Sequence, residues 1–215
     1  MRVTWIGGWG VAPEALRPLA EKYFPGSQHT LLAPVPGVTT NPPGADADLT
    51  IAWSLGAWRV LEAASRGREF SGMVLLFAPF VAFPAEAGYG GKCSVTQVKF
   101  LRRWLLREPP AALADFYRRA GLEWMAAPPG PTDAPLPYDL PDLLEGLDRL
   151  AEEPSPALRD FATRGLPRNW QAFVGDEDPL LEAETVRRSL PGCVRLRDAG
   201  HDLRALLRES GVLSV

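Results

Sequence analysis

The stretch 50–57, Thr-Ile-Ala-Trp-Ser-Leu-Gly-Ala, restricts the possible folds more than any other part of the chain. Its first four residues favour a buried strand, and the residues after Ser54 have the spacing of an amphipathic helix. Ser54 stands at the junction with no residues left for a loop, so strand and helix must meet in one sharp turn. The small residues Ala52 and Gly56 flank this turn and let the strand and the helix cross closely. The sequence therefore predicts a strand–turn–helix unit with Ser54 at its apex.

Strand and helix patterns alternate along much of the chain. Short β-branched or apolar runs are separated by segments of helical spacing or by loops rich in proline and glycine. This alternation indicates an α/β fold with a mostly parallel sheet of about six strands and helices on both faces. The expected strands cover residues 2–6, 30–33, 48–53, 73–77, 169–174 and 193–196.

The alternation stops between about residues 91 and 166. Helices are expected there over 95–107, 111–120, 140–152 and 156–164, with a proline-rich linker over 128–137. We therefore expect an α/β core of residues 1–90 and 167–215, with a helical lid of residues 91–166 inserted after the fourth strand. Ligand sites of open parallel sheets lie at the carboxyl ends of the strands, so the lid is expected to lie over Ser54.

Composition excludes several classes of protein. The net charge of −3 argues against nucleic acid as a general partner. No run of 18 apolar residues is present, so no membrane span is expected, and the first residues lack the apolar core of a signal peptide, which predicts a cytoplasmic protein. The two cysteines, Cys93 and Cys193, are too few to build a disulfide framework or a metal site alone.

A serine becomes a nucleophile only when a base takes its proton, and the candidates for the base are two histidines. His201 follows the last expected strand and precedes the last expected helix. His29 precedes the second expected strand and is interpreted as a structural residue. Taken singly, Ser54 and His201 could each be a helix cap. Their order along the chain favours a catalytic pair.

An acid is needed to orient the histidine. The segment 175–179 follows the fifth expected strand and holds Asp176, Glu177 and Asp178. Asp178 stands three residues after Gly175, in a G-x-x-D pattern, and is favoured; Asp176 stays an alternative, and Glu177 is interpreted as a solvated turn residue. The predicted triad is Ser54, Asp178 and His201.

Two backbone N–H groups are needed to hold the oxyanion that forms during acyl transfer. Leu55 directly follows Ser54 and offers the first. The glycine turn 7–10, Gly-Gly-Trp-Gly, follows the first expected strand and offers the second through Trp9. An ordinary glycine loop is the alternative interpretation of this turn.

These motifs resemble those of the α/β-hydrolase superfamily over nearly the whole chain. Within it, the chain is similar to the pimeloyl-acyl-carrier-protein methyl ester esterases of biotin synthesis. The resemblance is carried by 8–10 (GWG), 53–57 (WSLGA), a helical lid, the stretch 143–158, 175–178 (GDED) and 200–201 (GH). The family usually has histidine where this chain has Gly7, and glycine where it has Ala52.

The resemblance implies the α/β-hydrolase fold without the first two strands of its full form. It also implies cleavage of the methyl ester of pimeloyl-acyl-carrier-protein, which yields methanol and a free carboxylate. No metal or organic cofactor is implied. The partner would be a small acyl ester, carried in the family on an acidic acyl-carrier protein, with no nucleic acid and no membrane involved.

The segment 92–119 holds seven basic and two acidic residues, a net charge of +5. On a helix over 95–107, Lys99, Arg102, Arg103 and Arg107 share one face, while Phe100, Leu101, Trp104 and Leu105 share the other. A basic outer face over an apolar underside suits a lid that docks an acidic carrier protein. The alternative is an ordinary amphipathic helix with a solvated face.

The sequence thus predicts a serine carboxylesterase that acts through an acyl-serine intermediate. Two other functions stay open. One is a carboxylesterase or thioesterase for a different small acyl group. The other is a non-catalytic, hydrolase-like binding protein, which only the departures at Gly7 and Ala52 favour.

Overall fold

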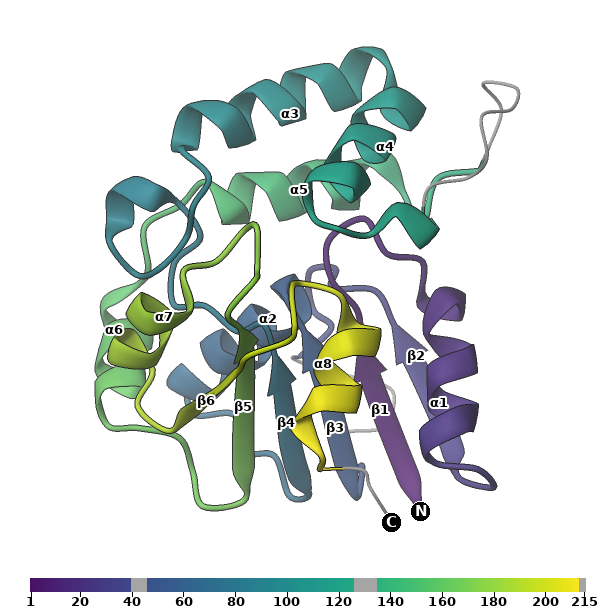
Figure 1. Cartoon of the computed structure of the whole chain (residues 1–215), viewed down its shortest axis with the longest axis vertical. Helices are drawn as coiled ribbons and strands as arrows, with labels where there is room; N and C mark the ends of the chain where they lie inside the picture. Colours follow the sequence, from purple (N-terminus) through teal and green to yellow (C-terminus); the bar gives the residue numbers. More distant parts are fainter. Residues whose placement is uncertain (40–45, 126–134, 213–215) are drawn as a thin grey trace.

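A computed structural model describes residues 1–39, 46–125 and 135–212. Its centre is a six-stranded sheet of order β2-β1-β3-β4-β5-β6 in which every neighbouring pair is parallel (Figure 1). The predicted α/β class and parallel sheet are confirmed. The strands are β1 Arg2–Ile6, β2 Gln28–Leu32, β3 Leu49–Trp53, β4 Met73–Phe77, β5 Trp170–Gly175 and β6 Cys193–Leu196.

The central strands are apolar because both faces of the sheet are covered. All five residues of β3 are buried, and in β4 only Met73, at the amino end, is exposed. In Figure 1, α1 (Arg17–Tyr23) and α8 (Leu203–Ser210) lie in front of the sheet, and α2 (Leu55–Ser65) lies behind it. Within the described ranges, no helix is long and apolar enough to span a membrane.

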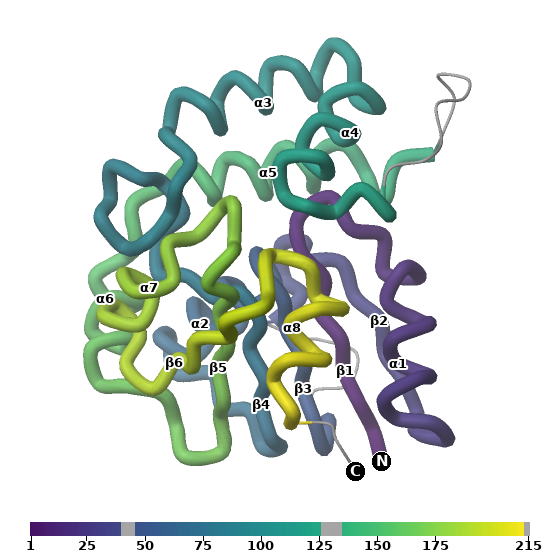
Figure 2. Tube along the Cα trace, in the orientation of Figure 1, coloured from purple at the N-terminus to yellow at the C-terminus, as the bar shows by residue number. Residues whose placement is uncertain are grey.

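Three helices lie over the carboxyl ends of the strands (Figures 1 and 2), and we call them the cap helices: α3 (Val95–Arg107), α4 (Pro109–Arg119) and α5 (Leu140–Leu150). Ser94 and Gln97 form a capping box that starts α3 at the expected residue. α4 begins two residues before the expected helix 111–120, at Pro109, since proline fits the first turn of a helix. Residues 128–134 of the expected linker 128–137 lie outside the described residues.

Two helices differ from the sequence-based expectation. α6 (Pro156–Thr163) falls within the expected lid segment 91–166, yet it packs mainly against α2, and Phe161 contacts Trp170 of β5. The cap helices therefore end near Leu150. The sequence pattern did not predict α7 (Ala183–Ser189), a short helix rich in charged residues that packs beside β6 and begins where Glu182 caps two N–H groups.

Candidate active site

Ser54 occupies a strained turn between β3 and α2. Its φ of 57° is left-handed, a conformation that costs a non-glycine residue about 1–3 kcal/mol and is held in place by surrounding structure. A Cβ at Gly56 would lie 2.5 Å from the Gly7 carbonyl oxygen and 2.6 Å from that of Ile6, so only glycine fits there. Ala52 is fully buried, and its methyl group is accommodated in the strand. The structure thus contains the predicted sharp turn.

The structure brings Ser54, His201 and Asp178 together. His201 Nε2 lies 3.0 Å from Ser54 Oγ, and Nδ1 lies 2.7 Å from Asp178 Oδ2. An ionised carboxylate only accepts hydrogen bonds, so Nδ1 carries the proton in the neutral ring, and Nε2 is free to accept the Ser54 hydroxyl proton. All three side chains are buried, with relative exposures of 7% for Ser54, 2% for His201 and none for Asp178.

Backbone and side-chain hydrogen bonds fix the acid and the histidine. Asp178 Oδ1 accepts from the N–H groups of Leu180 at 2.8 Å and Leu181 at 3.0 Å, which leaves Oδ2 for His201. The Trp53 indole donates to the His201 carbonyl at 2.9 Å. Lys92 donates to the Asp178 carbonyl. Lys92 belongs to the basic segment 92–119, and no feature of the neighbouring sequence predicts this contact.

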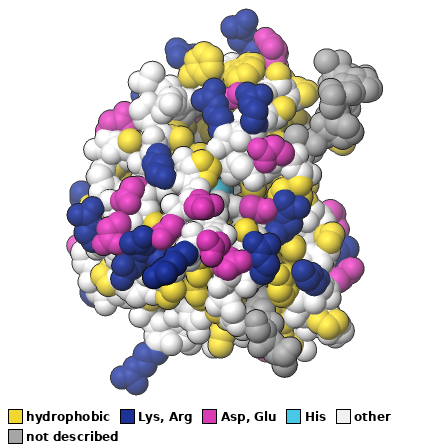
Figure 3. Space-filling view, in the orientation of Figure 1, with side chains coloured by type: hydrophobic (Ala, Val, Ile, Leu, Met, Phe, Trp, Pro, Cys, Tyr) yellow, Lys and Arg dark blue, Asp and Glu magenta, His cyan; other side chains and the backbone are white. Residues whose placement is uncertain are grey.

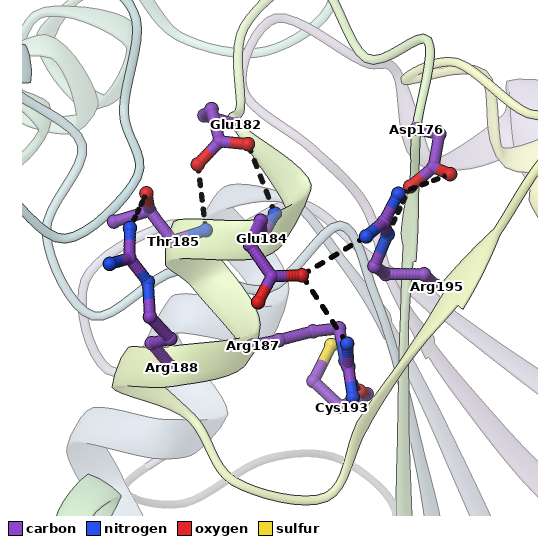
Figure 4. A network of polar contacts seen from close by, with 8 residues as sticks. All are labelled: Asp176, Glu182, Glu184, Thr185, Arg187, Arg188, Cys193 and Arg195. Carbon is purple, nitrogen blue, oxygen red and sulfur yellow. Dashed lines mark hydrogen bonds and ion pairs between the residues drawn. The ribbon is translucent and has the colours of Figure 1, made fainter.

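Asp176, the alternative acid, points elsewhere. Both of its carboxylate oxygens accept from Arg195, at 2.6 and 2.7 Å, in a surface network beside α7 (Figure 4). The hydrogen bonds from Arg195 lower the pKa of Asp176. Glu177 is exposed, as expected. His29 lies in β2, where Nδ1 accepts from the Trp5 indole at 3.3 Å and Nε2 lies 3.1 Å from the Phe24 carbonyl, a structural role.

The glycine turn after β1 lies against the Ser54 turn. A Cβ at Gly8 would be 3.3 Å from Ser54 Cβ. Within the described part of the chain, the backbone N–H groups of Trp9 and Leu55 have no hydrogen-bond acceptor. Both belong to the two turns that meet at Ser54, so they are available to an oxygen atom that arrives there.

A pocket of about 520 Å³ opens between the cap helices and the loop that carries Asp178. Aromatic and aliphatic side chains form most of its wall, among them Phe83, Trp104, Phe116 and Leu180. Phe116 also packs edge-on against the Trp9 ring, with centroids 4.7 Å apart. Ser54 and His201 are not among the residues that line the pocket, but Leu180 of its wall donates its N–H to Asp178.

Among the described residues, no group of three or more histidine, cysteine, aspartate or glutamate side chains is arranged to hold a metal ion. Burial raises the pKa of Cys193 to about 12 and also raises that of Cys93, so both thiols are protonated near neutral pH.

Comparison with known proteins identifies the fold of the chain. No protein-family model matches the sequence, and no curated protein matches it either. Solved structures do match. An esterase from Exiguobacterium antarcticum is 15% identical with a TM-score of 0.66, over 98% of this chain and 88% of the other. An α/β hydrolase from a Medee basin deep-sea metagenome library is 11% identical with a TM-score of 0.60, over 99% and 87%. The chain has the α/β-hydrolase fold.

A third match is a thermophilic esterase from Thermogutta terrifontis, 16% identical with a TM-score of 0.60, over 100% of this chain and 87% of the other. Identities this low establish the α/β-hydrolase fold and no more. In this fold a nucleophile stands on the turn after a central strand, and acid and histidine follow in chain order on later loops. Ser54, Asp178 and His201 occupy these positions.

Several residues around Ser54 and Trp9 were not predicted from the sequence. Gly146 of α5 lies on Trp9, where an added Cβ would be 2.6 Å from the indole, and the Trp9 indole donates to the Leu143 carbonyl at 2.8 Å. Tyr117 and Tyr138 bond to the backbone of Gly10. One sequence signal could have indicated a close contact: Gly146 interrupts a strong helical pattern, and such a glycine often has a packing reason.

Proposed function

We propose that this protein is a serine carboxylesterase. The observation that carries the proposal is the unbroken chain of contacts from Ser54 Oγ through His201 to Asp178, on a strained turn at the carboxyl end of the sheet. Solved structures of esterases with the same fold support it. Trp9 and Leu55 would supply the two N–H groups that stabilise the oxyanion.

The reaction has two halves. In the first, Ser54 Oγ bonds to the ester carbonyl carbon while its proton passes to His201 Nε2. The bond to the alcohol oxygen then breaks, and His201 returns the proton to the leaving alcohol. In the second half, water gives a proton to His201 and attacks the acyl-serine, which releases the carboxylic acid and restores Ser54. Asp178 stabilises the imidazolium in both halves.

Active-site labelling tests this proposal. A fluorophosphonate reacts with a serine only when a base and an oxyanion site activate it. We expect stoichiometric labelling at Ser54 by mass spectrometry, and hydrolysis of p-nitrophenyl esters by the same preparation. A folded protein that is not labelled and hydrolyses no ester would instead be the non-catalytic binding protein.

For the natural substrate, we propose the methyl ester of pimeloyl-acyl-carrier-protein, as the sequence resemblance implies. The support is the apolar pocket beside the triad, together with the basic residues of α3. A carboxylesterase or thioesterase for another small acyl group is the second candidate, since solved esterases share the fold. A profile of turnover against acyl length, with free and carrier-linked esters compared, distinguishes the two.

The proposed docking face is smaller than the sequence suggested. Arg102 faces α5, where its guanidinium pairs with Asp148 at 2.6 Å. Lys99, Arg103 and Arg107 are exposed and form no ion pair with a described residue. They recur every four residues and so form one stripe along α3. Figure 3 shows basic side chains beside hydrophobic ones at the top of the molecule, over α3.

The apolar face of α3 agrees with the expectation in part. Leu105 is buried, as expected, and Phe100, Leu101 and Trp104 line the pocket. Phe100 is 54% exposed, because it stands about 140° around the helix from Leu105 at 3.6 residues per turn. Phe100 therefore adjoins the basic stripe as an apolar contact for a partner.

Charge reversal tests docking. The triple change Lys99→Glu, Arg103→Glu and Arg107→Glu is expected to lower kcat/KM for the carrier-linked ester by about tenfold or more, since like charges would then face the acidic carrier. Turnover of a p-nitrophenyl ester should be unchanged. The matched control is Lys22→Glu, Arg66→Glu and Arg168→Glu, which makes the same change of charge on core elements outside the cap helices. Equal effects of the two triples on the carrier-linked ester would rule out docking at α3.

A further inference from the structure

The peptide groups that follow Trp9 are held by two tyrosine hydroxyls. The N–H of Gly10 donates to Tyr138 Oη at 2.9 Å, and the carbonyl of Gly10 accepts from Tyr117 Oη. The two bonds act on consecutive peptide groups, one on each side of the Gly10 Cα. Neither peptide can rotate without breaking its bond, so the backbone directly after the Trp9 N–H is fixed.

Both tyrosines come from the helical segment between β4 and β5. Tyr117 belongs to α4, and Tyr138 stands two residues before α5. The loop after β1 rises from the sheet to the level of these helices (Figures 1 and 2). The Trp9 side chain is held from the same side, because its indole donates to the Leu143 carbonyl of α5. The sheet alone therefore does not set the conformation of residues 9 and 10.

The backbone conformation and the surroundings of Gly10 favour these two hydrogen bonds. Gly10 has a φ of 73°, which favours glycine, and a Cβ there would lie 3.2 Å from the Leu113 side chain. Burial raises the pKa of Tyr117 to about 12 and also raises that of Tyr138. The Tyr117 hydroxyl therefore keeps the proton that it donates to the Gly10 carbonyl at any pH suited to an esterase assay.

We propose that Tyr117 and Tyr138 are positioning residues that aim the Trp9 N–H at the oxyanion, so that the cap helices complete the catalytic site. This inference rests on the proposed function. An oxyanion donor acts only when it is held in place before the charge develops, and small displacements of such groups slow the chemical step. Removing either hydroxyl should therefore lower kcat more than it changes KM.

The test uses Tyr117→Phe, Tyr138→Phe and the double variant, with Tyr23→Phe on α1 as the matched control. We expect each single change to lower kcat for a p-nitrophenyl ester about 10- to 100-fold, with KM altered by less than about threefold. Because both hydroxyls hold the same turn, the loss in the double variant should be smaller than the product of the single losses. Assays are run well below the melting temperature of each variant.

A second readout separates positioning from general loosening. A trifluoromethyl ketone forms a tetrahedral oxyanion adduct with an active serine, so its inhibition constant should rise by the same factor as kcat/KM falls. The corresponding methyl carbinol, which forms no adduct, should bind all variants alike. If Tyr117→Phe fails to fold, Tyr138→Phe provides the same test, because it removes the hydroxyl that accepts from the Gly10 N–H.

Two negative outcomes are distinct. In the first, the wild type is active, and Tyr117→Phe and Tyr138→Phe equal Tyr23→Phe in kcat and in ketone inhibition. This result overturns the inference and leaves the proposed function standing. A wild-type protein that neither hydrolyses esters nor reacts with a fluorophosphonate overturns the proposed function, and the positioning role falls with it.

Discussion

Replacing Ser54 by alanine is expected to lower kcat for a p-nitrophenyl ester by about 10⁶-fold, because the side chain that forms the acyl intermediate is gone. Ser54 Oγ is the atom that faces His201 Nε2, and no other described hydroxyl is bonded to that ring. Alanine has the same Cβ, so the left-handed turn is strained to the same degree and the fold should be retained. Steady-state kinetics and thermal melting measure the two effects separately.

The control for this change is Ser65→Ala, in the last turn of the same helix. The Ser65 hydroxyl donates to the Glu62 carbonyl and lies far along α2 from the site. Its removal should leave kcat within about twofold, since isolated surface substitutions have small effects. A Ser54→Ala protein that keeps more than about a hundredth of the wild-type kcat would show that another group is the nucleophile.

Asp178→Asn is expected to lower kcat by about 10⁴-fold with little change in KM. The Leu180 and Leu181 N–H groups need an acceptor, so the amide oxygen should stay with them and the NH₂ group should face His201. That NH₂ group donates to Nδ1, which places the ring proton on Nε2. Nε2 then cannot accept the Ser54 proton. Kinetics over a range of pH check this result, because a wrong tautomer is not corrected by raising the pH to any moderate value.

Asp176→Asn is the matched control in the same loop. It removes a charge that pairs with Arg195 on the surface, and exposed pairs of this kind contribute about 0–1 kcal/mol. Its kcat should stay within about twofold of the wild-type value. Equal losses for the two variants would mean that the loop as a whole, and not contact with His201, is what the reaction needs.

The cap helices enclose Ser54 and its neighbours. Ser54 is 7% exposed, and α5 packs onto Trp9 through Gly146. The buried guanidinium of Arg59 on α2 pairs with Glu145 of α5 and ties the cap to the core. Removing one partner of such a pair is strongly destabilising, because the other charge would stay buried without a partner. The cap helices are therefore an integral part of the site.

Much of this could be predicted from local sequence. The strands, α3 with its capping box, and the turn at Ser54 follow from periodicity and from small residues, which act over a few positions. The order of Ser54, Asp178 and His201 along the chain was also readable, because parallel strands bring the loops after them to one edge of the sheet. In the segment 91–166, the bounds of α3 match the predicted helix 95–107, whereas the packing of α6 against α2 was not predicted.

What the sequence by itself determined is thus the parallel sheet and the set of side chains that could react. Only the tertiary structure decided which carboxylate meets His201, since Asp178 and Asp176 differ by two residues and Arg195 takes one of them. It also placed Arg102 against Asp148 and brought the tyrosines to Gly10, across separations of 46, 107 and 128 residues. Such pairings depend on how distant segments pack, and the periodicity of the local sequence does not predict them.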